Sequence, residues 1–453
     1  MKAQEHPVVI LGLGVSGLGC SIALARRGVP FVALEREDRA GGLAKSDMVG
    51  GFPFDYGPHV LLQMPEEVKA LLGELDGVRF NEYPGRSGIV LGTRMEEVVP
   101  APFQLHLHQL PVATRARLAL GEWRGRSATP ANYAEYAAAQ CGPGAYELFV
   151  RGYDLKRPRF PLEEIPPDWT TRMERTSLRS IFVPTNGQEH REQRFLYPAA
   201  GGIEALPQAM ARLLPEACAR YGSEAVEIEP ETQVARLANG EAVRYGQLVT
   251  SLPLPETVAR IRNAPAEVRR AAADLLYTSV YVINAIVAGP LPPWSILRFP
   301  DPALGFYRLS FPSQYGAKGT QCAVTGEISH HPTRHPLSPQ QAARQFHEGL
   351  KRLGILRGGE RAVLESVRNI AYGHVLYYHG TQASRRMILD YLRAHGIHCC
   401  GKYGRWRDML IPQSIVSGME AARAVLSEPQ RDSICGLFGG GQRGRRQGGC
   451  GSR

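Results

Sequence analysis

The sequence lacks the cysteine patterns that mark secreted or zinc-binding proteins. Its eight cysteines are scattered over 453 residues and form neither a C-x-x-C pair nor a Cys/His spacing suited to zinc. A disulfide framework and a metal site are therefore both disfavoured. The N-terminal region also lacks a secretory signal, because its first apolar run is interrupted by regularly spaced glycines. We predict a cytoplasmic protein without a metal site.

Long apolar segments are equally scarce. The stretch 275–297 has no charged residue, but it contains Asn284 and three prolines. These residues suit a buried strand and its exit loop better than a helix that spans a membrane. The chain also has no internal repeat. We therefore expect a globular protein with no membrane partner.

Positive charge is in excess, but it is not concentrated in one helix or loop of the main body of the chain. The 53 Lys and Arg residues outnumber the 43 Asp and Glu residues, which gives a net charge of +10. Residues 431–453 hold five arginines, one aspartate and eight glycines, and so contribute +4 of this charge. Such a segment can bind RNA, but a disordered tail is the simpler interpretation. We therefore expect no nucleic-acid partner.

A glycine motif near the N-terminus predicts a nucleotide-binding unit. The pattern reads as strand, glycine turn, helix and strand at 8–11, 12–17, 18–27 and 31–34. Gly12 permits the tight turn, Gly14 lets the backbone approach a pyrophosphate, and Gly17 allows the helix to pack closely on the strand. Glu35 ends the second strand, where a carboxylate accepts hydrogen bonds from ribose hydroxyls.

A second glycine pair favours FAD over NAD as the cofactor. Gly41 and Gly42 follow Glu35 closely, and their backbone amides can approach the far phosphate and the flavin ring of the longer cofactor. A second G-x-G-x-x-G motif does not occur, so the chain has no NADPH-binding domain of its own. We therefore predict FAD.

The remaining pattern predicts an α/β fold with an interrupted domain. Residues 277–288 and 321–328 alternate apolar and polar side chains like half-buried antiparallel strands. We predict a Rossmann-like FAD-binding domain with a parallel sheet, interrupted by a substrate domain of mixed helices and antiparallel sheet. The FAD-binding domain is assigned 1–75, 200–262 and 396–430. The substrate domain is assigned 76–199 and 263–395, and a disordered tail 431–453.

Several motifs resemble one enzyme family. Residues 41–60, GGLAKSDMVGGFPFDYGPHV, resemble the flavin-contacting loop of UDP-galactopyranose mutases and their relatives in the amine oxidase and protoporphyrinogen oxidase superfamily. Further resemblances follow in the same order at 149–156 with Trp169, 197–203, 248–254, 299–315 and 401–414. The resemblance covers about residues 8–425 and is more specific for the superfamily than for the mutase-like branch.

The resemblance implies a role for each matching residue. The implied cofactor contacts are Gly12, Gly14, Ser16, Gly17, Glu35, Arg36, Gly41, Gly42, Leu43, His59, Gly401, Lys402, Gln413 and Ser414. His59 is expected against the flavin near N5, and Arg308 and Tyr315 are expected to bind the diphosphate of a nucleotide-sugar. These three residues are the implied catalytic set. The implied substrate-binding set is Arg298, Tyr307, Arg308, Tyr315, His374, Asp408 and Arg172.

The chain departs from the mutase pattern at several of these positions. Lys402 replaces an arginine and keeps its charge without its planar fork. Asp408 stands where the mutases have a phosphate-binding tyrosine, and Arg298 also replaces a tyrosine. Met173 stands where an arginine is expected four residues after Trp169. The partner of Arg308 is expected to be an anion, either a ligand or a buried acidic side chain.

Three functions remain open, of which we favour the first, with the second as the alternative. The first is a mutase-like, redox-neutral flavoenzyme that acts through flavin N5 on a nucleotide-linked sugar or a related anionic metabolite and needs an external reductant. The second is an FAD-dependent oxidoreductase of the amine oxidase, desaturase or protoporphyrinogen oxidase type, which transfers hydride from substrate to flavin. The third is an FAD-binding module without catalysis. The residues do not identify the sugar, the base or the oligomeric state.

Overall fold

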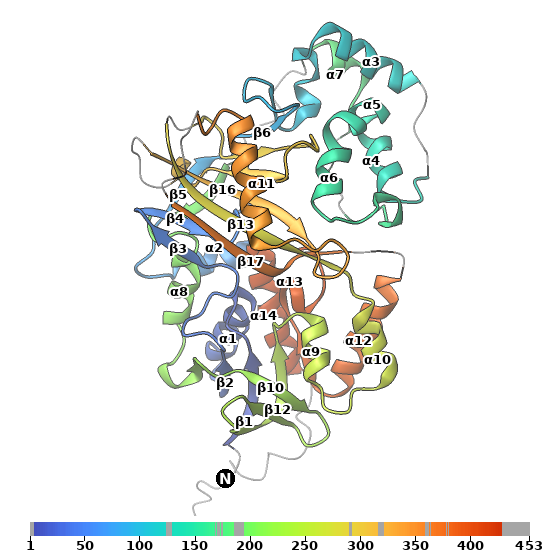
Figure 1. Cartoon of the computed structure of the whole chain (residues 1–453). Helices are drawn as coiled ribbons and strands as arrows, with labels where there is room; N and C mark the ends of the chain where they lie inside the picture. The colour runs from blue at the N-terminus through green and yellow to red at the C-terminus, as the bar shows by residue number, and fades with distance from the viewer. Residues whose placement is uncertain are drawn as a thin grey trace, which may run out of the picture.

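The computed structural model describes most of the chain. The described residues are 4–123, 129–167, 169, 173, 175–184, 194–289, 292–315, 321–357, 362, 364–376, 378 and 380–427. The predicted tail at 431–453 and the predicted substrate residue Arg172 lie outside this set. Figure 1 shows the N-terminal sheet at the lower end of the molecule and the helices α3 to α7 as a lobe at the upper right.

A mainly parallel sheet has the N-terminal strand at its centre. Its strands in spatial order are β10 (Ala225–Glu229), β11 (Val234–Leu237), β12 (Ala242–Thr250), β1 (Gln4–Leu11), β2 (Phe31–Leu34) and β9 (Ala219–Arg220), and β18 (Ile397–Cys399) also pairs with β12. β1 is parallel to β12 and β2, whereas β11 is antiparallel to its neighbours. Because β1 is buried on both faces, its side chains alternate between two apolar cores.

Helices cover both faces of this sheet. The core on one face contains α1 (Val15–Ala25), α2 (Glu66–Gly73), α8 (Ala205–Arg212) and α14 (Ile411–Ser427). The core on the other face contains α9 (Leu254–Arg260), α10 (Ala266–Ala273) and α12 (Thr381–Ala394). α1 and α14 cross at backbone distance, since a Cβ added at Gly418 would lie 1.9 Å from the carbonyl oxygen of Ser16.

A second, mainly antiparallel sheet carries the predicted substrate residues Arg298, Arg308 and His374. Its order is β17 (Leu364–Val375), β13 (Tyr277–Ala288), β16 (Gln321–His330), β15 (Arg308–Ser310), β14 (Ile296–Arg298), β6 (Ser87–Val90) and β7 (Val98–Pro100). Only the β14–β6 pair among these described strands is parallel. α11 (Pro339–Arg352) covers one face and buries Phe346 against Gly326. The predicted fold class, with a parallel and an antiparallel sheet, is confirmed.

Smaller elements connect these sheets. Two hairpins pair β3 (Ser46–Val49) with β4 (Phe52–Asp55), and β5 (Phe80–Pro84) with β8 (Arg194–Pro198). The helical lobe contains α3 (Val112–Trp123), α4 (Tyr133–Cys141), α5 (Pro143–Ala145), a π-helical turn (Tyr146–Arg151), α6 (Gly152–Lys156) and α7 (Leu178–Phe182). The short helix α13 (Gly401–Gly404) follows β18. Among the residues that the structure describes, no helix combines the length and apolar character that a membrane crossing requires.

Candidate functional site

The carboxyl edge of the parallel sheet brings the predicted cofactor residues together. The register pairs Leu11 of β1 with Leu34 of β2 and with Thr250 of β12. Thr250 in turn pairs with Cys399 of β18. The chain therefore leaves each strand at the same edge, at Gly12, Glu35, Ser251 and Cys400. This is the edge at which parallel sheets bind nucleotides.

The glycine turn between β1 and α1 has no room for side chains. Gly12 has a φ of +88°, and a Cβ added at Gly17 would lie 1.9 Å from the carbonyl oxygen of Gly12. Gly14 precedes α1, and no side chain caps the helix there. The first-turn amides of α1 therefore remain available for a phosphate, and the helix dipole favours its negative charge. This arrangement fits the pyrophosphate of FAD.

Glu35 lies beside this turn. Its Oε2 accepts a hydrogen bond of 2.7 Å from the N–H of Leu13, and its Oε1 accepts one of 3.0 Å from the N–H of Glu37. A carboxylate has further lone pairs, which can accept hydrogen bonds from a ribose. Arg36 is exposed and its side chain lies 3.3 Å from the carboxylate of Glu37 rather than against the glycine turn.

The second glycine pair lies directly on the first turn. The N–H of Gly41 donates to the carbonyl oxygen of Leu13 at 2.9 Å, and a Cβ added at Gly42 would lie 3.1 Å from the Cα of Gly14. Leu43 packs toward the antiparallel sheet, against a small core that contains Val280. The segment between the cofactor edge and the second sheet therefore begins at this glycine pair.

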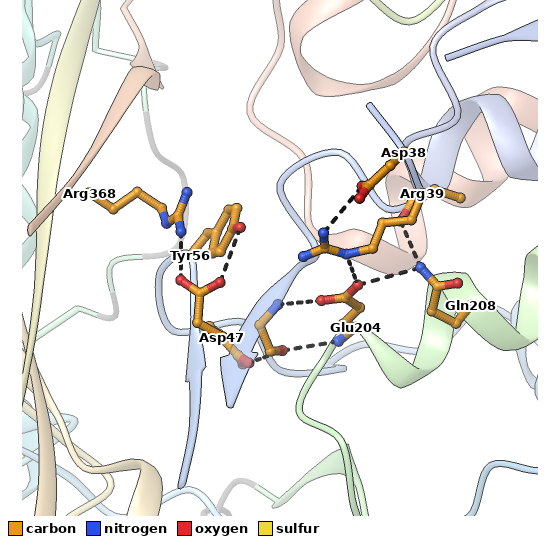
Figure 2. A network of polar contacts seen from close by, with 10 residues as sticks. Asp38, Arg39, Asp47, Tyr56, Glu204, Gln208 and Arg368 are labelled. Atoms are coloured by element: carbon orange, nitrogen blue, oxygen red, sulfur yellow. Dashed lines mark hydrogen bonds and ion pairs between the residues drawn. The ribbon is translucent and has the colours of Figure 1, made fainter. Parts of the chain in front are cut away.

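A polar network holds that segment in place (Figure 2). Arg39 pairs with Glu204 at 2.5 Å, and Glu204 also accepts the N–H of Ser46 at 3.0 Å. Gln208 of α8 donates to the carbonyl oxygen of Ala40 at 3.0 Å. The backbone is thus attached to Glu204 and Gln208 both before and after the pair Gly41 and Gly42, at Ala40 and at Ser46. These contacts preorganise the backbone of this segment for a ligand.

The same figure shows how the segment connects to the second sheet. Arg368 of β17 pairs with Asp47 of β3 at 2.6 Å, and its guanidinium lies 3.9 Å from the ring centroid of Tyr56. The hydroxyl of Tyr56 also donates to Asp47 at 3.4 Å. These contacts fix β3 and the residues after β4 against β17.

The predicted C-terminal flavin segment closes over α1. Gly401 has a φ of +77°, and a Cβ added there would lie 2.2 Å from Oγ of Ser16. Ser16 and Ser414 are both buried, so they contribute to packing. Gln413 is exposed, and its Oε1 accepts a hydrogen bond of 2.9 Å from the N–H of Leu410. Direct cofactor contact by Ser16, Gln413 and Ser414 stays a prediction.

Arg308 has a buried acidic partner. It lies on β15 directly opposite Glu327 of β16, and the two side chains form an ion pair through Nε of Arg308. The carboxylate of Glu327 is 6% exposed, whereas the Arg308 side chain is 23% exposed. The charge of Glu327 raises the pKa of Arg308 despite the opposing effect of burial. Arg308 is therefore held in place while part of its side chain stays accessible.

His59 lies close enough to Arg308 for the charge of the arginine to affect the pKa of the histidine. Burial, together with the charges of Lys402 and Arg308, lowers the pKa of His59 to about 4, so its imidazole is neutral at pH 7. Its Nδ1 is buried and has no hydrogen-bond partner among the described residues. An unpaired buried nitrogen is costly, and a flavin edge would satisfy it. This observation fits the predicted position of His59 beside the cofactor.

Tyr307 and His374 form the adjoining wall. The hydroxyl of Tyr307 and Nε2 of His374 are 3.1 Å apart, and the Tyr307 side chain is buried. Burial and the nearby charges of Arg157, Lys402 and Arg308 lower the pKa of His374 well below its usual range. His374 is therefore neutral, and its Nε2 accepts a hydrogen bond from the hydroxyl of Tyr307 or donates one to it, according to its tautomer.

Lys402 and Asp408 meet at the opening of this cluster. Their side chains form an ion pair of 3.1 Å, in which Lys402 is 22% exposed and Asp408 is 53% exposed. Asp408 therefore neutralises part of the charge of Lys402. A carboxylate repels an anionic substrate, and the pairing with Lys402 reduces this repulsion.

Tyr315 lies deeper than a direct substrate contact requires. Its ring is 6% exposed and packs 4.6 Å from the ring centroid of Tyr197. A cavity of about 10 Å³ separates Tyr315 from Asp55, which is room for one water molecule. Arg298 stands opposite Arg308 on β14 and acts electrostatically on Asp154. The roles of Tyr315 and Arg298 stay predictions.

Arg157, which follows α6, is a residue of this region that was not predicted from the sequence. Its guanidinium lies 4.5 Å from the ring centroid of Trp169 and 5.9 Å from that of Tyr153. It affects the pKa of His374 and of Tyr307, so it belongs to the same cluster. The sequence offered one indication of its role: Arg157 directly follows the segment 149–156, which resembles a segment of the mutases.

The sequence and the fold are similar to those of known flavoenzymes. The profile of the family described as flavin containing amine oxidoreductase matches residues 15–426. A crystal structure of reduced UDP-galactopyranose mutase is 25% identical, with a TM-score of 0.84 over 93% of this chain and 95% of that chain. Cyclohexylamine oxidase from Brevibacterium oxydans IH-35A is 16% identical, with a TM-score of 0.64 over 93% of this chain and 98% of that chain, a likeness of fold alone.

Curated relatives share shorter segments. A zeta-carotene-forming phytoene desaturase from Myxococcus xanthus is 23% identical over 320 residues, 61% of this chain and 59% of the desaturase. A lycopene-forming phytoene desaturase from Pantoea ananas is 36% identical over 77 residues, 17% of this chain and 15% of that enzyme. The matches thus span less than two thirds of these relatives. The family profile covers most of the chain, and the chain therefore belongs to the flavin-containing amine oxidoreductases, a family of FAD-dependent enzymes.

Proposed function

We propose that this protein is a mutase-like FAD enzyme that acts on a nucleotide-linked sugar or a related anionic metabolite at the site around Arg308. The observation that carries this proposal is the convergence of cations on two neutral histidines. Burial lowers the pKa of His59 and of His374 most, and the charges of Lys402 and Arg308 lower both further, with Arg157 contributing more than either of them at His374. The electrostatic potential between the histidines is therefore positive, which favours an anion.

The acidic partners do not remove this potential at the histidines. Glu327 holds Arg308 from the sheet side, and Asp408 holds Lys402 from the exposed side. Neither carboxylate contributes to the pKa of His59, whose shift comes from burial and the two cations. The two carboxylates thus hold the two cations in place, while burial and these cations keep His59 neutral. The likeness to UDP-galactopyranose mutase over nearly the whole chain supports the same substrate class.

Each residue of the site has a definable task. Bound FAD supplies the reacting atom, flavin N5. Arg308 binds the anionic group of the substrate and stabilises the charge that this group gains when it leaves. His59 stays neutral, so it offers one donor and one acceptor without adding a charge. The hydroxyl of Tyr307, which lies 3.1 Å from Nε2 of His374, is a neutral hydrogen-bonding group that adds no charge to the site.

The test compares the oxidised and the dithionite-reduced protein. We expect UDP, GDP or dTDP to bind the reduced form, and turnover of the matching nucleotide-sugar to require reduction without net oxidation. Arg308→Ala should abolish turnover while the flavin spectrum is retained. Turnover with oxidised flavin and oxygen consumption contradicts the proposal, and so does the absence of nucleotide binding to either form.

A second candidate is an FAD oxidoreductase that takes hydride from its substrate. It is favoured by the desaturase relatives and by the ion pairing of both Arg308 and Lys402, which lowers the formal charge of the site. In this case, a substrate should bleach the flavin spectrum and oxygen should restore it. The mutase-like enzyme shows no such bleaching, so one spectrum distinguishes the candidates.

A further inference from the structure

Large apolar side chains gather on two helices of the helical lobe. Of the ten that are exposed in the described part of the chain, five lie on α3, on α7 or directly after α7. We call these five residues the lobe patch, and each is between 43% and 71% exposed: Val112, Leu120, Leu178, Phe182 and Val183. Single exposed apolar residues are common, but their concentration on two neighbouring helices marks an interaction surface.

α3 carries its exposed apolar residues on one side. Val112, Ala116 and Leu120 follow one another at intervals of four residues, which places them on the same side of a helix. All three are exposed, whereas Leu118, on the opposite side, is buried in the core of the lobe. A surface helix ordinarily turns a polar side to water. The outer side of α3 therefore has the character of a side that meets an apolar phase.

α7 repeats this arrangement. Ser177 caps the helix, because its side chain accepts a hydrogen bond of 3.2 Å from the N–H of Ser180. Leu178 and Phe182 are one turn apart and both exposed, whereas Ile181 is buried in the core of the lobe. α3 and α7 pack against each other, and Figure 1 shows them together at the top of the lobe. Their exposed apolar sides therefore belong to one end of the molecule.

Arginines accompany the lobe patch. Arg117 of α3, Arg179 of α7 and Arg175 just before α7 are all exposed. In the sequence, residues 111–126 include four arginines and one glutamate, and residues 172–184 include three arginines and one glutamate. Apolar side chains accompanied by arginines are typical of helices that lie on an anionic bilayer, where the guanidinium groups meet lipid phosphates.

A second copy of this chain fits the lobe patch less well. A closed dimer uses the same surface of both subunits, so the arginines of one patch would face those of the other. A lipid surface instead offers phosphates of opposite charge, and it admits projecting side chains without needing a matching hollow. Charge complementarity therefore favours the lipid surface.

We propose that the lobe patch binds the surface of an anionic lipid bilayer, with its apolar side chains inserted at the boundary between headgroups and acyl chains. A protein bound in this way lies on the membrane without crossing it. This inference replaces the expectation of no membrane partner, which considered only a helix that spans the bilayer. It does not depend on the proposed function, because the lobe patch contains none of the residues assigned to the cofactor or the substrate.

The test is co-sedimentation of the FAD-loaded protein with vesicles of phosphatidylcholine alone and of phosphatidylcholine mixed with phosphatidylglycerol. Leu120→Ser combined with Phe182→Ser removes apolar surface from both helices. Val226→Ser combined with Met387→Ser is the matched control, because these apolar side chains are also exposed but lie on β10 and α12. Unchanged FAD content and denaturant unfolding verify that both double variants are folded. Both retain the arginines of 431–453, so a difference between them does not come from that segment.

We expect the unmodified protein and the control to bind the phosphatidylglycerol vesicles, and Leu120→Ser with Phe182→Ser to weaken this binding about tenfold or more. Binding to phosphatidylcholine alone should be weaker, and added salt should weaken binding to the anionic vesicles. Equal binding by the two double variants would assign the lipid contact to another surface and overturn the inference. Absence of binding by the unmodified protein at low salt would also overturn it. A dimer that Leu120→Ser with Phe182→Ser converts to a monomer, without vesicle binding, would make the lobe patch a contact between copies of this chain.

Discussion

The cofactor edge of the parallel sheet and the charged cluster around Arg308 on the antiparallel sheet are held together by different kinds of contact. At the cofactor edge, backbone meets backbone: Gly42 lies against Gly14, and Gly17 lies against the carbonyl of Gly12. At the charged cluster, side chains from separate strands meet, as Arg308 does with Glu327. The first kind of contact depends on the absence of atoms, and the second depends on the pairing of charges.

This difference teaches how each region responds to change. Repacking of neighbouring side chains cannot make room for a side chain at Gly17, because its Cβ would overlap a backbone oxygen. An ion pair can be lost in two ways, by removing one partner or by removing both. Removing one partner leaves an uncompensated buried charge, whereas removing both partners leaves no buried charge. The two regions should therefore differ in whether a second substitution restores stability.

The largest effect is expected at the glycine turn. Gly17→Ala should abolish FAD binding and destabilise the fold by about 3 kcal/mol or more, because the new Cβ would lie 1.9 Å from a carbonyl oxygen. Gly73→Ala is the matched control, since nothing lies within 4 Å of its added Cβ. The measurements are bound FAD per protein and chemical unfolding. Normal FAD content in Gly17→Ala would contradict the structural role of the turn.

The next effect is expected at the buried ion pair. Arg308→Met should destabilise the protein by about 2–3 kcal/mol, because Glu327 is left unpaired in a buried position. The double variant Arg308→Met with Glu327→Gln should regain most of this stability but not the ability to bind an anion. Unfolding in denaturant measures the first quantity and ligand titration the second.

This pair of variants separates packing from function. A double variant that recovers both stability and anion binding would show that Arg308 has a structural role alone. A double variant that stays as unstable as Arg308→Met would place the contribution of Arg308 in contacts other than Glu327.

Much of the fold was predictable because its signals are local. The alternation at 277–288 predicted a half-buried strand; β13 spans Tyr277–Ala288, but it is buried on both faces because other elements cover both sides of the sheet. The spacing of Gly12, Gly14 and Gly17 predicted a strand, a tight turn and a helix, and FAD as the cofactor agrees with the family. Such patterns repeat within a few residues, so they are visible before the chain folds.

The charged cluster was less predictable because it depends on strand register. Arg308 and Glu327 are 19 residues apart and become neighbours only through the β15–β16 pairing. Arg157 reaches the cluster through Trp169 and Tyr153, whose packing is tertiary. No spacing in the sequence indicates that these side chains come into contact. The sequence predicted an anionic partner for Arg308 but left open whether it was a ligand or an acidic side chain.

Asp55 offers a smaller effect that connects the two regions. Burial raises its pKa to about 7, although hydrogen bonds from Ser46, Ile203 and Tyr197 oppose the shift. The folded protein therefore binds one proton more than the unfolded chain between about pH 4 and pH 7, so this group's contribution to stability falls as the pH rises through that range.

Asp55→Asn should remove this dependence, and we expect the change in unfolding free energy between pH 5 and pH 7 to shrink by about 1–2 kcal/mol. Tyr197→Phe removes a donor to the carboxylate, so the transition should move to higher pH. Denaturant unfolding at several pH values measures both. An unchanged slope in Asp55→Asn would mean that Asp55 titrates alike in the folded and unfolded chain.

The smallest effect on stability, and the sharpest contrast with Gly17, is expected at Lys402 and Asp408. Asp408 is 53% exposed, so Asp408→Asn should change the unfolding free energy by less than about 1 kcal/mol. Because the substitution releases Lys402 from its carboxylate, pyrophosphate should bind several-fold more tightly, and added salt should reduce the gain. Asp390→Asn is the control, an exposed ion pair on α12. Weaker binding in Asp408→Asn would mean that Asp408 positions Lys402 for the ligand rather than competing with it.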